Sequence, residues 1–225
     1  QAGSYGANSV AVGNSNTVSG DAAIAIGSKS QATLSNATAI GNTATANRVG
    51  TIAIGTRAQA GDFVANPNVA TDAQLAGKLS ARQDGADRAV AVGYESRAVG
   101  YKSNAIGSGA WALDNPSTAI GSSAQATANH AQAFGAGAQA TGAHTNAIGS
   151  SAIASGDHAQ AYGAGAQAQG ERANAFGSDA HAAADYAMAI GDHSVASDAN
   201  SVAIGYKSQS APATSVNSAS VATTS

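Results

Sequence analysis

Residues 89–121 read AVAVGYESRAVGYKSNAIGSGAWALDNPSTAIG, in which alanine, a bulky apolar residue and glycine recur every fourteen residues. These triplets end at Gly93, Gly107 and Gly121. Outward from this stretch, the same triplet ends at Gly13, Gly27, Gly41, Gly55, Gly135, Gly149, Gly163, Gly177, Gly191 and Gly205. Every step is fourteen residues except the one from Gly55 to Gly93. A fixed period of this kind is typical of a repeat architecture.

Small and larger residues alternate before each of these glycines. The small set is the alanine of the triplet and the Ser, Ala or Thr two residues before it. A second alternation follows the glycine, with mostly small residues three and five positions later and commonly glutamine between them. Alternation with period two predicts strands, and glycine predicts a turn. Each unit therefore predicts strand, turn, strand and turn, which is one coil of an all-β parallel solenoid.

The larger set of the first strand mixes isoleucine with amides such as Gln132 and Asn146. An unpaired amide in a dry interior would cost roughly a few kcal/mol. We therefore expect the small residues of both strands to face inward, while isoleucine facing inward opposite alanine remains the alternative. The larger residues would then form an external apolar stripe, which usually marks an interface. Identical chains would supply matching stripes along a shared axis.

Three segments carry a resemblance to a known family: NSVAVGNSNTVSG from Asn8, NAIGSSAIASG from Asn146 and NSVAIGYKSQS from Asn200. They resemble the SVAIGxxSxAxG repeats of YadA-like head domains in trimeric autotransporter adhesins of Gram-negative bacteria. The resemblance covers nearly all of residues 5–212. It implies a left-handed parallel β-roll of 14-residue coils, assembled as a parallel homotrimer.

The resemblance also implies a function and an interface. The implied function is that of a virulence-associated adhesin head, which is displayed at the bacterial outer membrane and attaches the cell to host cells or extracellular-matrix protein through multivalent contacts. The alternative is a passive spacer or shield that holds another binding domain away from the cell surface. The residues expected to face the threefold axis or a neighbouring chain are Ile40, Ile54, Ile106, Phe134, Ile148, Tyr162, Phe176 and Ile190.

An insertion interrupts the repeat. We expect a head domain over residues 1–212, with coils at 5–60 and 89–212 and an excursion at 61–88. Residues 213–225 would lead toward a neck, a stalk or a further head. The excursion either covers a neighbouring chain, forms a ligand-binding protrusion or links the coils loosely.

Two leucines four residues apart, Leu75 and Leu79, predict a short helix or helical turn within the excursion. Together with Phe63 and Trp111 they are the candidate ligand contacts. Trp111 stands in the exposed second-strand position that glutamine usually holds. Its ring is expected to cover a chain boundary or the excursion, or else to contact a ligand.

Composition narrows the classes of function. Charged residues make up 10% of the chain, the net charge is −3, and Lys and Arg occur singly, so nucleic acid is not an expected partner. There is no cysteine, and no apolar run approaches the roughly 20 residues of a membrane span. We expect any membrane anchor to lie outside this chain. Carboxylates do not recur in pairs within a coil, so neither enzyme activity nor a cofactor is expected.

Three histidines recur at one place in consecutive repeats: His130, His144 and His158 each lie five residues before the repeat glycine. Their side chains should stack at roughly 5 Å steps along one edge of the solenoid. The simplest interpretation is a solvated row of turn residues. Weak transition-metal binding or a protonation-sensitive contact is the alternative, because imidazole supports either. No other metal site is predicted.

Overall fold

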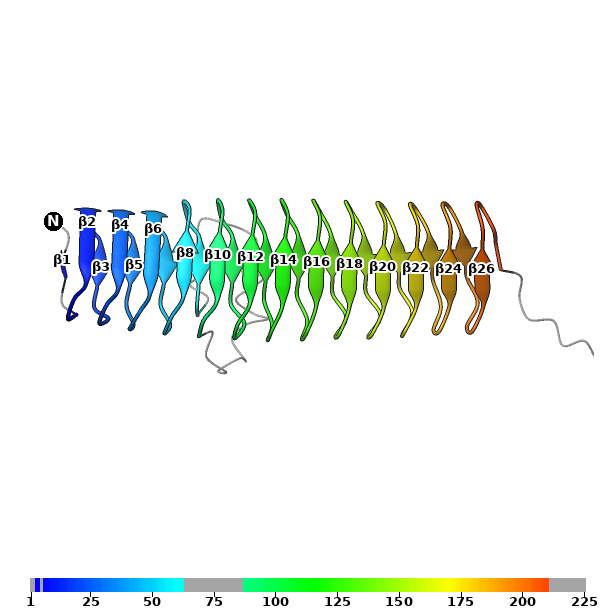
Figure 1. Cartoon of the computed structure of the whole chain (residues 1–225), viewed down its shortest axis with the longest axis horizontal. Coiled ribbons are helices and arrows are strands. Elements are labelled where there is room, and N and C mark those ends of the chain that lie inside the picture. Colours follow the sequence, from blue (N-terminus) through cyan, green and yellow to red (C-terminus); the bar gives the residue numbers. More distant parts are fainter. Residues whose placement is uncertain (1–2, 5, 63–86, 211–225) are drawn as a thin grey trace, which may run out of the picture.

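The chain forms a straight rod of short strands stacked side by side (Figure 1). The computed structural model describes residues 3–4, 6–62 and 87–210. Except across the inserted segment, Cα partners in neighbouring strands are fourteen residues apart, as in the pairing of Ala105 with Ala119. The parallel solenoid predicted from the repeat is therefore confirmed. Its left-handed sense stays a prediction.

The first sheet holds the strands that precede each repeat glycine. Its thirteen strands in the described part of the chain are all parallel. They are β2 (Val10–Asn14), β4 (Ile24–Ser28), β6 (Thr38–Asn42), β8 (Ile52–Ile54), β10 (Val90–Val92), β12 (Asn104–Ile106), β14 (Thr118–Ile120), β16 (Gln132–Phe134), β18 (Asn146–Ile148), β20 (Gln160–Tyr162), β22 (Asn174–Phe176), β24 (Met188–Ile190) and β26 (Val202–Ile204).

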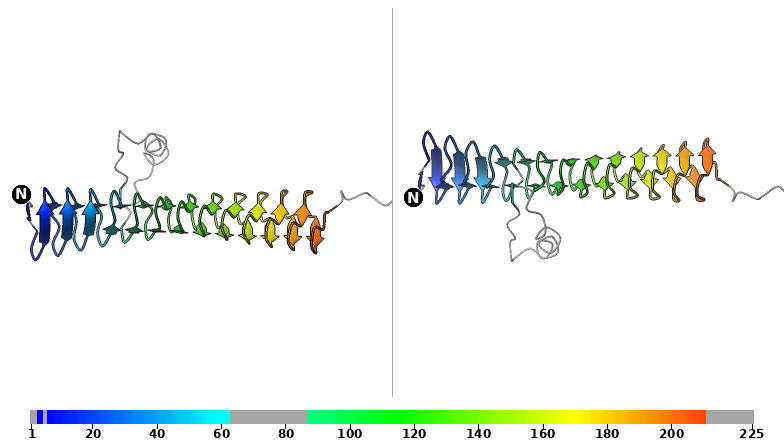
Figure 2. Two further views of the ribbon diagram at one scale, coloured as in Figure 1. Left: turned by 90° about the horizontal axis from the view of Figure 1, so that it is seen from above. Right: turned by 90° about the horizontal axis from the view of Figure 1, so that it is seen from below.

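The second sheet holds the two-residue strands that follow the glycines, and it runs beside the first along the whole described rod (Figure 2). These strands are β1 (Gly3–Ser4), β3 (Thr17–Val18), β5 (Gln31–Ala32), β7 (Thr45–Ala46), β9 (Gln59–Ala60), β11 (Arg97–Ala98), β13 (Trp111–Ala112), β15 (Gln125–Ala126), β17 (Gln139–Ala140), β19 (Ile153–Ala154), β21 (Gln167–Ala168), β23 (His181–Ala182) and β25 (Val195–Ala196).

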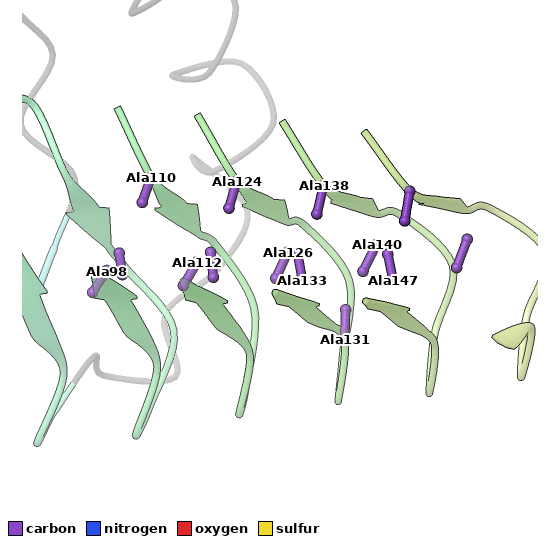
Figure 3. Close-up of a cluster of buried hydrophobic side chains, with 14 of the residues drawn as sticks. Ala98, Ala110, Ala112, Ala124, Ala126, Ala131, Ala133, Ala138, Ala140 and Ala147 are labelled. Carbon is purple, nitrogen blue, oxygen red and sulfur yellow. The ribbon is translucent and has the colours of Figure 1, made fainter. Parts of the chain in front are cut away.

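Alanine fills the space between the two sheets. Ala133 and Ala147 of the first sheet point toward Ala126 and Ala140 of the second (Figure 3), and all four are fully buried. Methyl groups suffice because two short strands enclose little volume. The prediction that the small residues face inward is confirmed, and the alternative with isoleucine inside is wrong.

Hydroxyl groups that replace some of these alanines are satisfied locally. The buried Ser103 donates from Oγ to the carbonyl of Gly100 at 2.6 Å, and the buried Thr145 donates from Oγ1 to that of Gly142 at 2.6 Å. The buried amide of Asn16 donates from Nδ2 to Val12 O at 2.7 Å and accepts at Oδ1 from Ser30 N at 2.9 Å. A buried polar group is tolerated when it is hydrogen-bonded in this way.

The coil turns sharply at its corners, which places side chains in the left-handed backbone region. Non-glycine residues five before and two after the repeat glycine have φ between +52° and +61°, as His144 and Ser151 do at +57°, and Pro116 is the exception among the described corners. The repeat glycine itself is required because the backbone of the next coil approaches it closely. At Gly149, φ is +137° and an added Cβ would lie 2.3 Å from the carbonyl oxygen of Gly163. Only glycine fits there.

The strands on either side of the inserted segment pair directly with each other. Ile52 is in register with Val90, and Gln59 is in register with Arg97. The amide of Gln59 donates to the carbonyl of Ser96 at 2.8 Å. Both sheets therefore continue across this gap in sequence. The predicted helix around Leu75 and Leu79 lies outside the described residues.

Candidate functional site: the outer surfaces of the rod

The outer surface of the first sheet carries an apolar column, defined here as the residues immediately before the repeat glycines. It contains the eight residues predicted for the trimer contact, and the register places Val12, Ile26, Val92, Ile120 and Ile204 in the same column. Ile148 keeps 37% relative exposure, although it lies in the middle of the rod. Neighbouring coils stack without covering this column, so it faces away from the interior along the described length.

Aromatic residues continue the apolar column toward the C-terminal half. Tyr162 and Phe176 stack with ring centroids 5.1 Å apart and planes 12° from parallel. The Tyr162 hydroxyl donates to Oε1 of Gln160 at 3.1 Å, so its polar end is partnered within the same strand. The two rings therefore add a flat apolar surface to the column.

A second outward column lies beside it and consists of the residues three before the repeat glycines. Its polarity changes along the rod. It is apolar near both ends, where Val10 and Val202 are exposed, and polar in the middle. In the middle, Asn146 donates from Nδ2 to Oε1 of Gln160 at 2.6 Å. Of the amides that argued against an inward orientation, Asn146 therefore has a partner on the outside. This change from apolar ends to a polar middle can be read from the sequence. The eight predicted contact residues, however, all belong to the first column.

The outer surface of the second sheet is polar over most of its length. Its outward column includes the glutamines Gln31, Gln59, Gln125, Gln139 and Gln167. Isoleucine or valine takes this place only at Ile153 and Val195 among the described strands. The two outer surfaces of one coil thus differ in chemistry although their inner surfaces are alike.

Trp111 is less exposed than the sequence predicted. The Arg97 guanidinium lies 5.4 Å from the centroid of the Trp111 ring, and Trp111 is half-buried. Arg97, at the same outward place one coil earlier, is only 4% exposed. The expectation that this position faces water is wrong for Arg97. A stacked cation and indole shield each other from solvent, which accounts for part of the difference.

A polar cluster joins the coils on either side of the inserted segment. Arg57 donates from Nη1 to Oε1 of Glu95 at 2.7 Å and contacts the Tyr94 hydroxyl at 3.2 Å. The hydrogen bond from Arg57 lowers the pKa of the Glu95 carboxyl from its usual value. This ion pair is partly exposed, so its contribution to stability is small.

The three repeated histidines form a histidine column on one corner of the rod. The ring centroids of His130 and His144 are 4.8 Å apart, and those of His144 and His158 are 5.0 Å apart, with planes 10° and 19° from parallel. All three residues are exposed. The predicted stacking is confirmed.

No group of three or more His, Cys, Asp or Glu side chains within residues 3–4, 6–62 and 87–210 is arranged to hold a metal ion. The alternative interpretation of the histidine column as a metal site therefore gains no support from its geometry. In the same ranges, no helix has the length and hydropathy needed to cross a membrane. The candidate contacts Phe63, Leu75 and Leu79 lie outside the described residues.

Comparison with known protein families shows to which family the chain belongs. A model of the YadA head domain repeat matches residues 4–30, 35–58, 85–110, 115–138, 168–194 and 182–208, which is more than half of the chain. The chain belongs to the YadA head domain family. YadA heads are non-enzymatic, adhesin-type repeats of surface-exposed bacterial autotransporters, so membership suggests an adhesin-type function. No curated protein sequence matches the chain.

The matched segments lie on both sides of the inserted segment, and the match leaves residues 59–84 uncovered. The match also leaves the coils of residues 139–167 uncovered. The apolar column and the alanine interior come from positions inside the matched repeat, such as Ile106 and Ala105.

Proposed function

We propose that this rod is the head of a trimeric adhesin, in which three parallel copies place their apolar columns against one another. The observation that carries the proposal is the continuity of that column from Val12 to Ile204 on one side of the rod. A contiguous exposed apolar surface of this kind is typical of an interface. A partner with the same 14-residue spacing would match it coil by coil, and a second and third copy of the chain have that spacing.

In this assembly the polar outer surface of the second sheet remains available for ligands. The glutamine column would be replicated along the rod and again around three chains. Individual contacts there are weak, but simultaneous contacts raise the apparent affinity by roughly 10² to 10⁴. The proposed ligand is a host extracellular-matrix protein or cell-surface receptor, bound without catalysis or cofactor. The proposed location is the bacterial cell surface, with attachment to the outer membrane.

A spacer remains the second candidate. The observation that favours it is the uniformity of the rod, in which alanine-lined coils with nearly identical corners follow one another from Ala89 to Ala203. Such a rod extends a neighbouring domain without needing a ligand of its own.

Binding to immobilised matrix proteins separates these two functions. The intact chain should bind surfaces coated with collagen, fibronectin or laminin much more tightly than it binds short soluble pieces of the same proteins. The matched control is Ile148→Asp, which is designed to break the trimer and should lower binding to the coated surface. A wild-type trimer without affinity for any matrix protein or for host cells would contradict the adhesin assignment and leave the spacer.

A further inference from the structure

We propose that the histidine column is an acid-dependent binding site for a linear polyanion, most specifically a sulfated polysaccharide. The column consists of His130, His144 and His158. The choice of a polysaccharide rests on the proposed display of this head outside the cell, whereas the anion site itself rests on the geometry of the column.

The position of the three rings is fixed by the backbone. Each histidine occupies a left-handed corner, with φ of +56°, +57° and +61°. Its amide donates to a carbonyl in the preceding coil: His130 to Asn115 O at 3.2 Å, His144 to Asn129 O at 2.9 Å and His158 to Ala143 O at 2.8 Å. The spacing of the rings is therefore set by the spacing of the coils and does not depend on flexible loops.

The ring nitrogens are available to a ligand. Among the described residues, none of the three rings makes a side-chain hydrogen bond or an ion pair, and each residue is exposed. A protonated imidazole donates from both Nδ1 and Nε2. Protonation of the column would present donors and positive charge at intervals of 4.8 and 5.0 Å.

Other cations continue the same corner. Arg172 follows His158 one coil later in the same place, and its guanidinium contacts the Tyr186 hydroxyl at 3.1 Å and the Tyr186 ring at 5.5 Å. Lys102 holds the equivalent place two coils before His130. Permanent positive charge therefore lies one coil beyond His158 and two coils beyond His130, with the uncharged Pro116 between Lys102 and His130.

Acidic groups lie beyond the column on both sides and also beside its middle. Asp114 lies on the coil before His130 and is mostly buried. Asp157 precedes His158 and accepts the Ala143 amide at 2.9 Å, and Glu171 lies 3.9 Å from Arg172. His144 has Asn129 and Ala143 beside it on the corner, and the Asp157 carboxylate that accepts the Ala143 amide lies next to His144 and His158.

Three like charges at this spacing repel one another, and an anion bound along them offsets the repulsion. Binding therefore favours the protonated rings and becomes stronger as the pH falls through the range in which imidazole takes up its proton. A polysaccharide with a sulfate on most sugars repeats its negative charges at a similar interval along a line. A single compact anion reaches only part of the column and should bind less tightly.

The test is the binding of the full chain to immobilised heparin at pH 5.0 and pH 7.5 and constant ionic strength. We expect affinity to be about tenfold or more higher at pH 5.0, with a slope of log K against log salt that is steeper by about 2, because three additional charges take part. Equal affinity at the two pH values would overturn the proposal.

Equivalent corners in other coils show which residues this backbone conformation accepts. Asn occupies the same corner place with positive φ at Asn8, Asn36 and Asn200, and Arg does so at Arg88 and Arg172. The triple variant His130→Asn, His144→Asn, His158→Asn should lose the acid enhancement and remain folded. The corresponding triple Arg variant should bind heparin at both pH values. Acid enhancement that survives in the Asn variant would contradict the proposal.

A matched control removes two histidines elsewhere. His181 stands in the glutamine column, and His193 stands at a corner position that serine holds in other coils. The variant His181→Gln, His193→Ser should keep the full acid enhancement, and loss of it would move the site away from the column.

Two further arms test the nature of the ligand. Binding should persist in EDTA, since a requirement for a metal ion would overturn a purely protonation-based site. A single-stranded DNA oligonucleotide bound as tightly as heparin would overturn the assignment to a sulfated polysaccharide. The oligomeric state is measured separately by sedimentation, so failure of heparin binding in an intact trimer is distinguishable from failure of the proposed assembly.

Discussion

The two sheets of this rod are alike on the inside and different on the outside. Ala147 and Ala140 face each other in the interior and are both fully buried. On the outside, Ile148 of the first sheet belongs to an apolar column, whereas Gln139 of the second belongs to a polar one. Both strands therefore need small residues on their inner side. Their outer residues differ because one outer surface is apolar, as an interface between copies requires, and the other is polar, as contact with water requires.

The largest expected effect comes from the interior that the two sheets share. Ala147→Leu places three extra carbons where neighbouring alanines leave no room, which costs about 1–3 kcal/mol or more in each chain. Thermal unfolding followed by circular dichroism should show a strongly lowered Tm. Ala140→Leu should act similarly. The control Ile148→Leu points outward and should change Tm little. A Tm for Ala147→Leu equal to that of wild type would contradict the close-packed interior.

The next effect separates the outer surfaces. Ile148→Asp would bury an unpaired charge in each copy if the apolar column is the interface, which opposes association. We expect the variant to dissociate at micromolar concentration in sedimentation experiments. The matched change on the other surface, Gln139→Asp, puts the same charge in water and should leave assembly intact. If Gln139→Asp dissociates the trimer and Ile148→Asp does not, the interface lies on the second sheet.

Removal of the inserted segment should have a smaller effect, because both sheets pair across it. Deletion of residues 63–86 leaves Gly61, Asp62, Asp87 and Arg88 between Ala60 and Ala89, which is the four-residue corner of an ordinary coil. The strands that contain Ile52 and Val90 already pair, so the deletion requires no new strand pairing. The far-ultraviolet circular dichroism spectrum and the sedimentation mass should match those of a folded assembly. An unfolded deletion variant would show that the coils depend on the insertion.

The smallest expected effect concerns the ion pair between Arg57 and Glu95. Because the pKa of Glu95 is lowered by its hydrogen bond to Arg57, its contribution is present above the pKa of an unfolded glutamate and is lost as the pH falls through the folded value. Glu95→Gln should therefore be slightly less stable than wild type at pH 7, and the difference should shrink between pH 7 and pH 3. The measurement is the Tm of both proteins across this pH range. A difference in Tm that grew as the pH fell would contradict the account.

Much of this fold follows from the sequence because the period is strict. The alanines before and after each glycine indicated the interior, and the amides at Gln132 and Asn146 showed which side faces out. Corner conformations were less predictable. His144 and Lys102 adopt positive φ without being glycine, because stacking against neighbouring coils favours that conformation at the corner, and Pro116 is the exception among the described corners.

The candidate sites were predicted less completely than the fold. The stacking of the histidines followed from their spacing, but the cover of Arg97 over Trp111 did not. Those two residues belong to successive strands, and their contact depends on rotamers that a repeat pattern does not fix. Trp111 remains a candidate ligand contact with one side of its ring already occupied.

The central claim is that the apolar column of the first sheet is an interface between copies of this chain. Sedimentation equilibrium of the wild-type fragment at micromolar concentration measures this most directly. The account predicts a single species of three times the 21.5 kDa chain mass. A stable monomer of 21.5 kDa at that concentration would contradict it.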